Sequence, residues 1–150
     1  MRDIYAFVIE DDDATAHKIV QILSDAGMCV GGNPTGKYSV HFCTEERYDV
    51  ITLDLSLPDM DGIEVIRKLR AAKVTTPILV LTEDASVESK IKALGLGADD
   101  YMTKPFHKDE LVARLKAILR GREYGATEAT KFLQLLPKTG DTVSEPLASV

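Results

Sequence analysis

Short apolar runs that alternate with amphipathic stretches constrain the fold of this 150-residue chain more than any other feature. The runs at residues 4–9, 50–53 and 78–81 have the length of strands and are apolar at nearly every position. Such runs are typical of strands covered on both faces, as in parallel sheets. Between them, apolar residues recur every three or four positions, which predicts helices with one buried face.

The pattern predicts five strand–helix units over roughly the first 120 residues. Helices are expected at about 14–26, 38–46 and 62–72, from about 87, and through 111–119, with weaker strands at 28–31 and 100–103. This alternation predicts an α/β fold, a doubly wound five-stranded parallel sheet with five helices. In the flavodoxin-like strand order, 2-1-3-4-5, the first and third strands are neighbours, and ligands bind where the order reverses.

Composition excludes several classes of function. The 18 Lys and Arg against 24 Asp and Glu give a net charge of −6, which disfavours binding to duplex DNA by this chain alone. No apolar run approaches the roughly 20 residues that span a bilayer, and the first residues lack a signal-peptide layout, so we expect a cytoplasmic protein without membrane contact. Cys29 and Cys43 lack a metal-ligand spacing and are expected to be reduced thiols.

Acidic residues follow two of the strands that the fold brings together. The first strand runs into Glu10 and Asp11, and the third ends at Asp54. The next acids, Asp12 and Asp13, are read as solvated residues, one of which caps the following helix. Crowded carboxylates repel each other unless a cation compensates them, and oxygen ligands suit Mg²⁺. The sequence therefore predicts a magnesium site formed by Glu10, Asp11 and Asp54.

A hydroxyl and an ammonium group are expected at the same edge of the sheet. The fourth strand ends at Thr82, and Lys104 follows the fifth. Taken alone, Thr82 is equally well explained as a turn residue and Lys104 as an ordinary surface lysine. Together with the acids they predict a phosphoryl site, where Lys104 and a metal neutralise the oxygens, Thr82 donates a hydrogen bond and a carboxylate attacks.

These residues resemble a known signature. Glu10-Asp11, Asp54, Thr82 and Lys104-Pro105 are similar to the signature of two-component response-regulator receiver domains. The segment 57–62, Leu-Pro-Asp-Met-Asp-Gly, resembles the loop after the phosphoacceptor in that family, and the segment 97–106 resembles its OmpR/PhoB branch. The resemblance covers about residues 1–121, which we expect to form a receiver domain.

The resemblance implies a role for each matching residue. Asp54 would accept a phosphoryl group from a histidine kinase or a histidine phosphotransferase. Glu10, Asp11, Asp54 and the backbone carbonyl of Ser56 would hold Mg²⁺, while Thr82 and Lys104 would contact the phosphoryl oxygens. Tyr101 would act as a switch together with Thr82, although a half-buried edge-strand aromatic explains Tyr101 equally well. The Lys104–Pro105 bond would be cis.

The branch also implies phosphorylation-dependent pairing of two copies through the fourth helix, the fifth strand and the last helix. The charged residues expected on this dimer face are Lys90, Asp99, Asp100, Glu110 and Arg114. The simpler explanation is a solvated surface with a local Glu110–Arg114 pair, four residues apart on one helix.

Two features depart from the family pattern. Glu83 follows Thr82, where the family has a small residue, and we expect it to slow phosphorylation or to point into solvent. The segment 122–150 is expected to be a linker or a vestigial or truncated output tail, because a DNA-binding output domain needs roughly 100 residues. Residues 138–141 resemble the start of such a domain. Any contact with DNA would need an output domain outside these 150 residues; the alternative is a stand-alone receiver that acts by binding other proteins.

Two other classes fit less well. A haloacid-dehalogenase-type phosphatase also uses a strand-end Asp, but it needs a second acid two residues later, where this chain has Ser56. A flavodoxin must cradle a phosphate in its first loop, and the acids at 10–13 would repel that phosphate.

Overall fold

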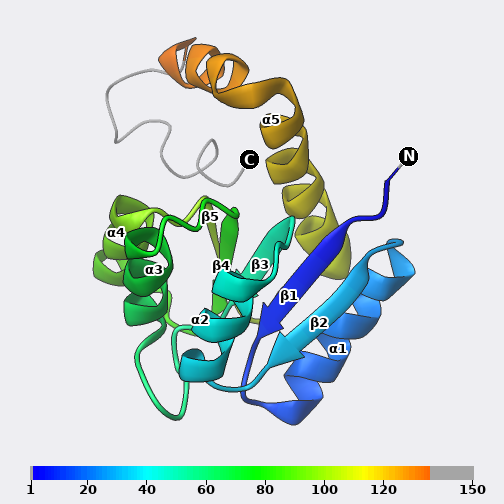
Figure 1. Cartoon of the computed structure of the whole chain (residues 1–150), viewed down its shortest axis with the longest axis vertical. Coiled ribbons are helices and arrows are strands. Elements are labelled where there is room, and N and C mark those ends of the chain that lie inside the picture. Colours follow the sequence, from blue (N-terminus) through cyan, green and yellow to red (C-terminus); the bar gives the residue numbers. More distant parts are fainter. Residues whose placement is uncertain (1, 136–150) are drawn as a thin grey trace.

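The computed structural model describes residues 2–135, and it describes side chains within 2–121. Five parallel strands form one sheet in the order β2-β1-β3-β4-β5, which confirms the predicted fold (Figure 1). The strands are β1 (Tyr5–Ile9), β2 (Cys29–Asn33), β3 (Val50–Leu53), β4 (Ile78–Thr82) and β5 (Asp100–Thr103). The helices are α1 (Asp13–Asp25), α2 (Gly36–Glu45), α3 (Gly62–Ala71), α4 (Val87–Leu96) and α5 (Lys108–Leu135).

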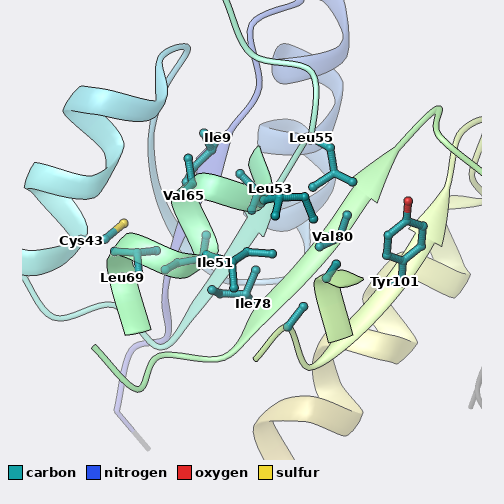
Figure 2. Packing of buried hydrophobic residues seen from close by; sticks show 14 of the residues in the cluster. Ile9, Cys43, Ile51, Leu53, Leu55, Val65, Leu69, Ile78, Val80 and Tyr101 are labelled. Atoms are coloured by element: carbon teal, nitrogen blue, oxygen red, sulfur yellow. The ribbon is translucent and has the colours of Figure 1, made fainter. Parts of the chain in front are cut away.

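The sheet is covered on both faces, as its apolar strands require. Side chains of α2, α3 and α4 pack on one face, where Ile51, Leu53 and Val80 are buried (Figure 2). Side chains of α1 and α5, including Leu23 and Leu115, pack on the other face. Strands β3 and β4 are completely apolar except for Thr52 and the terminal Thr82, because neither face meets water.

Local signals in the sequence fix where α1 begins and ends. Asp12 is the N-cap, and its carboxylate accepts a hydrogen bond from the N–H of Thr15 at 2.9 Å, as the helix-capping interpretation predicted. Beyond the C-terminus, Gly27 has a φ of 91°, a conformation that glycine adopts without strain.

The last helix is longer than the sequence pattern predicts. Apolar periodicity is lost after Arg120, yet the backbone of α5 stays helical to Leu135, and Figure 1 shows its second half passing beyond the sheet. Eight of the 14 residues at 122–135 are Ala, Glu, Lys, Leu or Gln, which favour helix without requiring a buried face. Residues 136–150 of the expected tail, including 138–141, lie outside the described residues. Even with α5 included, no helix in the described part is long and apolar enough to cross a membrane.

Arg70 joins the C-terminal ends of α3 and α4. Its guanidinium donates hydrogen bonds to the carbonyl oxygens of Val74 (2.7 Å), Thr76 (2.8 Å) and Gly97 (2.8 Å). Gly97 ends α4 with a φ of 119°, and a Cβ there would lie 2.9 Å from the Arg70 Nε. The end of α4 is therefore fixed to the neighbouring helix by hydrogen bonds that only a glycine leaves room for.

Candidate functional site

The predicted site residues meet at the carboxyl edge of the sheet. Glu10 follows β1, Asp54 follows β3, Thr82 ends β4 and Lys104 follows β5. Glu10, Asp54 and Thr82 are buried, with relative exposures of 4%, 7% and 1%. The parallel register places Ile9 beside Leu53, so that the two carboxylates that follow lie on adjacent strands. The structure thus brings together the residues that the sequence singled out.

Three carboxylates form a cluster with the composition of a hard-cation site. One oxygen each of Glu10, Asp11 and Asp54 lies within 4.8 Å of the others; Asp11 is the exposed member. Mg²⁺ prefers such oxygen ligands and usually keeps several waters. Ser56 donates its N–H to Asp54 Oδ1 at 3.2 Å, while the role of its carbonyl as a ligand stays a prediction.

Lys104 supplies a cation within this acidic cluster. Its Nζ donates to Glu10 Oε1 at 2.6 Å and to Asp54 Oδ2 at 3.0 Å. Burial raises the pKa of Glu10, and the negative charge of Asp54 acts in the same direction. Burial disfavours the Lys104 ammonium, but its hydrogen bonds to the two carboxylates prevail and raise its pKa. Lys104 is therefore held as a cation beside Asp54. The Lys104–Pro105 bond is cis, as the resemblance implied.

The loop between β4 and α4 connects the site to Tyr101. The Thr82 hydroxyl accepts a hydrogen bond from the N–H of Asp84 at 3.4 Å, and Tyr101 donates its hydroxyl to the carbonyl of Asp84 at 2.6 Å. Tyr101 is buried rather than half-buried, and burial raises its pKa to about 12. In Figure 2 it stands at the rim of the buried cluster, beyond Val80. One loop residue thus contacts both proposed switch residues.

The residues of the expected dimer face interact within the chain. Arg114 is only 6% exposed and binds both carboxylate oxygens of Asp100, at 3.0 and 2.9 Å, as well as Glu110 at 2.9 Å. Asp99 accepts a hydrogen bond from the N–H of Ile78 at 2.8 Å. The Lys90 ammonium lies 5.8 Å from the centre of the Tyr101 ring. The local Glu110–Arg114 pair is confirmed, and pairing between two copies stays a prediction.

Asp84 is a residue that the sequence reasoning missed. Its carboxylate accepts the N–H of Ser86 at 2.9 Å and the hydroxyl of Ser89 at 2.5 Å, which fixes the start of α4. Its backbone provides the contacts to Thr82 and Tyr101 described above. The Asp-x-Ser-x-x-Ser pattern at 84–89 is a helix-start signal that was available in the sequence.

The fold and the arrangement of the site define the class of protein. The sequence matches the response regulator receiver domain over residues 6–116, and the chain belongs to this family. It is 46% identical over 136 residues to the cell cycle transcriptional regulator CtrA of Caulobacter vibrioides, an alignment that covers 91% of this chain and 56% of the relative. The chain spans about half the length of the curated relatives it matches.

Solved structures show the same architecture. A CheY-like receiver domain protein of Methanospirillum hungatei JF-1 has a TM-score of 0.79 at 27% identity, with 82% of this chain and 98% of that chain covered. The receiver domain of the sensor histidine kinase PA1611 of Pseudomonas aeruginosa PAO1 has a TM-score of 0.74 at 29% identity, over 80% of this chain and 100% of that one. That structure contains a magnesium ion coordinated in its active site cleft.

Proposed function

We propose that this receiver domain accepts a phosphoryl group on Asp54 from a phosphohistidine of a kinase or phosphotransferase in the cytoplasm, in a reaction that requires Mg²⁺. The observation that carries the proposal is the position of Lys104, which contacts both Glu10 and Asp54 at the edge where Asp11 and Thr82 also lie. The carboxylate of Asp54 is the one that both Lys104 and the N–H of Ser56 hold in place.

The chemistry follows from these contacts. A carboxylate oxygen of Asp54 attacks the phosphorus atom, the phosphorus–nitrogen bond to the donor imidazole breaks, and the electron pair stays on that nitrogen. Lys104 neutralises charge on the phosphoryl oxygens, and the Thr82 hydroxyl donates to one of them. The same arrangement serves the later hydrolysis, in which water attacks the phosphorus atom, the bond from phosphorus to the Asp54 oxygen breaks and inorganic phosphate leaves, so the chain catalyses only its own phosphorylation and dephosphorylation.

The carboxylate cluster fits Mg²⁺ by the number, type and proximity of its oxygens. Glu10, Asp11 and Asp54 would hold the ion, with the Ser56 carbonyl as a further ligand. A bound Mg²⁺ supplies positive charge that offsets the charge of the incoming phosphoryl group. With this ion bound, Lys104 is the single additional positive charge needed to balance the three carboxylates.

The output begins at the Thr82 hydroxyl. When this hydroxyl turns to a phosphoryl oxygen, it gives up its contact with Asp84, the residue that also holds Tyr101 and the start of α4. The surface formed by α4, β5 and α5 then changes in favour of a two-fold homodimer. Val87 and Ile91 on α4 are 64% and 65% exposed and would lie at its centre. Control of transcription would require an output domain beyond the receiver.

Mass spectrometry tests the phosphorylation directly. The protein is incubated with phosphoramidate, with and without Mg²⁺, and compared with Asp54→Asn. We expect one added phosphoryl group in the wild type with Mg²⁺ and none in the variant. Full labelling of Asp54→Asn would refute the assignment.

Sedimentation with and without a beryllofluoride mimic tests the output. Because Arg114 is buried and paired, the matched variant is Ile91→Ser, which changes an exposed side chain instead. We expect mimic-dependent dimers in the wild type and monomers in Ile91→Ser. A wild type that stays monomeric at high micromolar concentration would favour the alternative, a stand-alone receiver that acts by binding a different protein.

A further inference from the structure

The loop between β4 and α4 begins with two acids that have different surroundings. The Asp84 carboxylate binds Ser86 and Ser89 at the start of α4. Glu83 is exposed, and within the described side chains its carboxylate makes no hydrogen bond or ion pair. The Glu83 carboxylate therefore forms no contact that stabilises the described part of the fold, although the residue directly follows Thr82.

The strand register gives the distance of Glu83 from the phosphoacceptor. Leu53 pairs with Val80, so Asp54 lies level with Leu81, and Glu83 lies two residues further along the chain, just beyond the end of β4 at Thr82. With strands about 4.8 Å apart and a rise of about 3.3 Å per residue, the Cα atoms of Asp54 and Glu83 are about 8 Å apart. Glu83 thus lies at the same edge of the sheet as Asp54.

Glu83 adds an exposed negative charge to this edge, as Asp12 and Asp84 also do. Lys104 and a bound Mg²⁺ together match the charges of Glu10, Asp11 and Asp54. An incoming phosphoryl donor therefore meets the Glu83 carboxylate as an additional negative charge. The repulsion grows with the negative charge of the donor.

We propose that Glu83 is a specificity-determining residue that selects against small dianionic phosphoryl donors such as acyl phosphates. This inference rests on the proposed phosphorylation of Asp54 and concerns which donors deliver the group. A donor that carries a single negative charge meets about half of that repulsion.

The expected size follows from the separation. For an illustrative charge separation of about 8 Å in water, one unit charge on the donor changes the rate by about twofold and a dianion by about fivefold. Salt shortens the range of this interaction to about 3 Å at 1 M ionic strength, which removes most of the effect. Charge dependence and salt dependence therefore separate repulsion from simple obstruction by the side chain.

The test compares wild type, Glu83→Gln and Glu45→Gln, a control that removes the same charge from an exposed position at the end of α2. Labelling rates are measured at pH 7 with Mg²⁺, using acetyl phosphate as the dianion and phosphoramidate as the less charged donor. At low salt we expect Glu83→Gln to react about fivefold faster with acetyl phosphate and about twofold faster with phosphoramidate. Both gains should shrink at high salt, and Glu45→Gln should match the wild type.

Calorimetric titration with Mg²⁺ alone provides a readout that needs no phosphorylation. Because Glu83 attracts the cation, Glu83→Gln should bind Mg²⁺ a few-fold more weakly at low salt, and Glu45→Gln should not. Equal rates for Glu83→Gln and wild type, or an equal gain with both donors at every salt concentration, would overturn the inference. If no protein is labelled with either donor, the proposed phosphorylation itself fails, which is a different result.

Discussion

Arg114 offers the most direct test of the packing described here, through the substitution Arg114→Met. The arginine is 6% exposed and is the partner of Asp100, whose side chain is only 13% exposed. Methionine fills a similar volume but leaves the Asp100 carboxylate buried without its cation. Removing one partner of a buried ion pair costs about 3–5 kcal/mol, a large part of the 5–15 kcal/mol that stabilises a typical domain. For a domain of this size the loss corresponds to a melting temperature lower by about 10–20 °C.

Urea unfolding followed by circular dichroism measures this loss, with Glu110→Gln as the matched control. Glu110 also binds Arg114, but its side chain is 52% exposed, so its loss should cost no more than about 1 kcal/mol. In the Arg114→Met background, Asp100→Asn should recover part of the stability because it removes the unpaired charge. If Arg114→Met costs no more than Glu110→Gln, Arg114 does not form a buried pair in solution and is free to face a second copy.

Three further predictions concern other buried polar groups and the metal site. Burial raises the pKa of Asp100 above its usual 3.8, so the stability that Asp100 contributes is present below pH 3.8 and is lost as the pH rises through the raised pKa. The unfolding free energies of wild type and Asp100→Asn should therefore diverge as the pH increases from about 4. Parallel curves of unfolding free energy against pH would contradict the raised pKa. Mg²⁺ at ten times its dissociation constant should raise the unfolding free energy by about 1.4 kcal/mol, and thermal melts of Asp11→Asn should show a smaller gain at the same concentration. The buried Thr52 hydroxyl has no hydrogen-bond partner among the described residues, so Thr52→Val should stabilise the protein by roughly 1 kcal/mol in urea unfolding, and a clear loss of stability would show that the hydroxyl is satisfied.

The strands and the site were predictable because both depend on local sequence. Apolar runs such as 78–81 mark strands buried on both faces, and polar residues directly after them must lie at one edge of a parallel sheet. The edge strand β2 was harder to delimit, because Gly31 and Gly32 weaken a strand signal. The helical backbone at 122–135 reflects residue propensity rather than periodicity, so a search for an apolar face does not detect it.

The environment of Arg114 could not be predicted in the same way. Its pair with Glu110 is a matter of helical spacing and was expected. Its pair with Asp100 joins β5 to α5 and depends on how closely that helix packs, which no local pattern specifies. Arg114, which the sequence places on an expected dimer face, is therefore a buried structural residue in the fold.

The attachment of α4 at its C-terminal end has a mechanical consequence. Arg70 holds the carbonyl of Gly97, whereas the first turn of α4 follows the Asp84 loop, whose contacts would change if the Thr82 hydroxyl turned to a phosphoryl group as proposed. In the proposed switch, the helix, about 15 Å long, would pivot about its last residue. A tilt of about 10° moves its first turn by about 2.5 Å and leaves its last turn almost in place. Val87 is the first residue of α4 and Ile91 lies near its middle, so a small rotation of this kind would displace two strongly exposed apolar side chains.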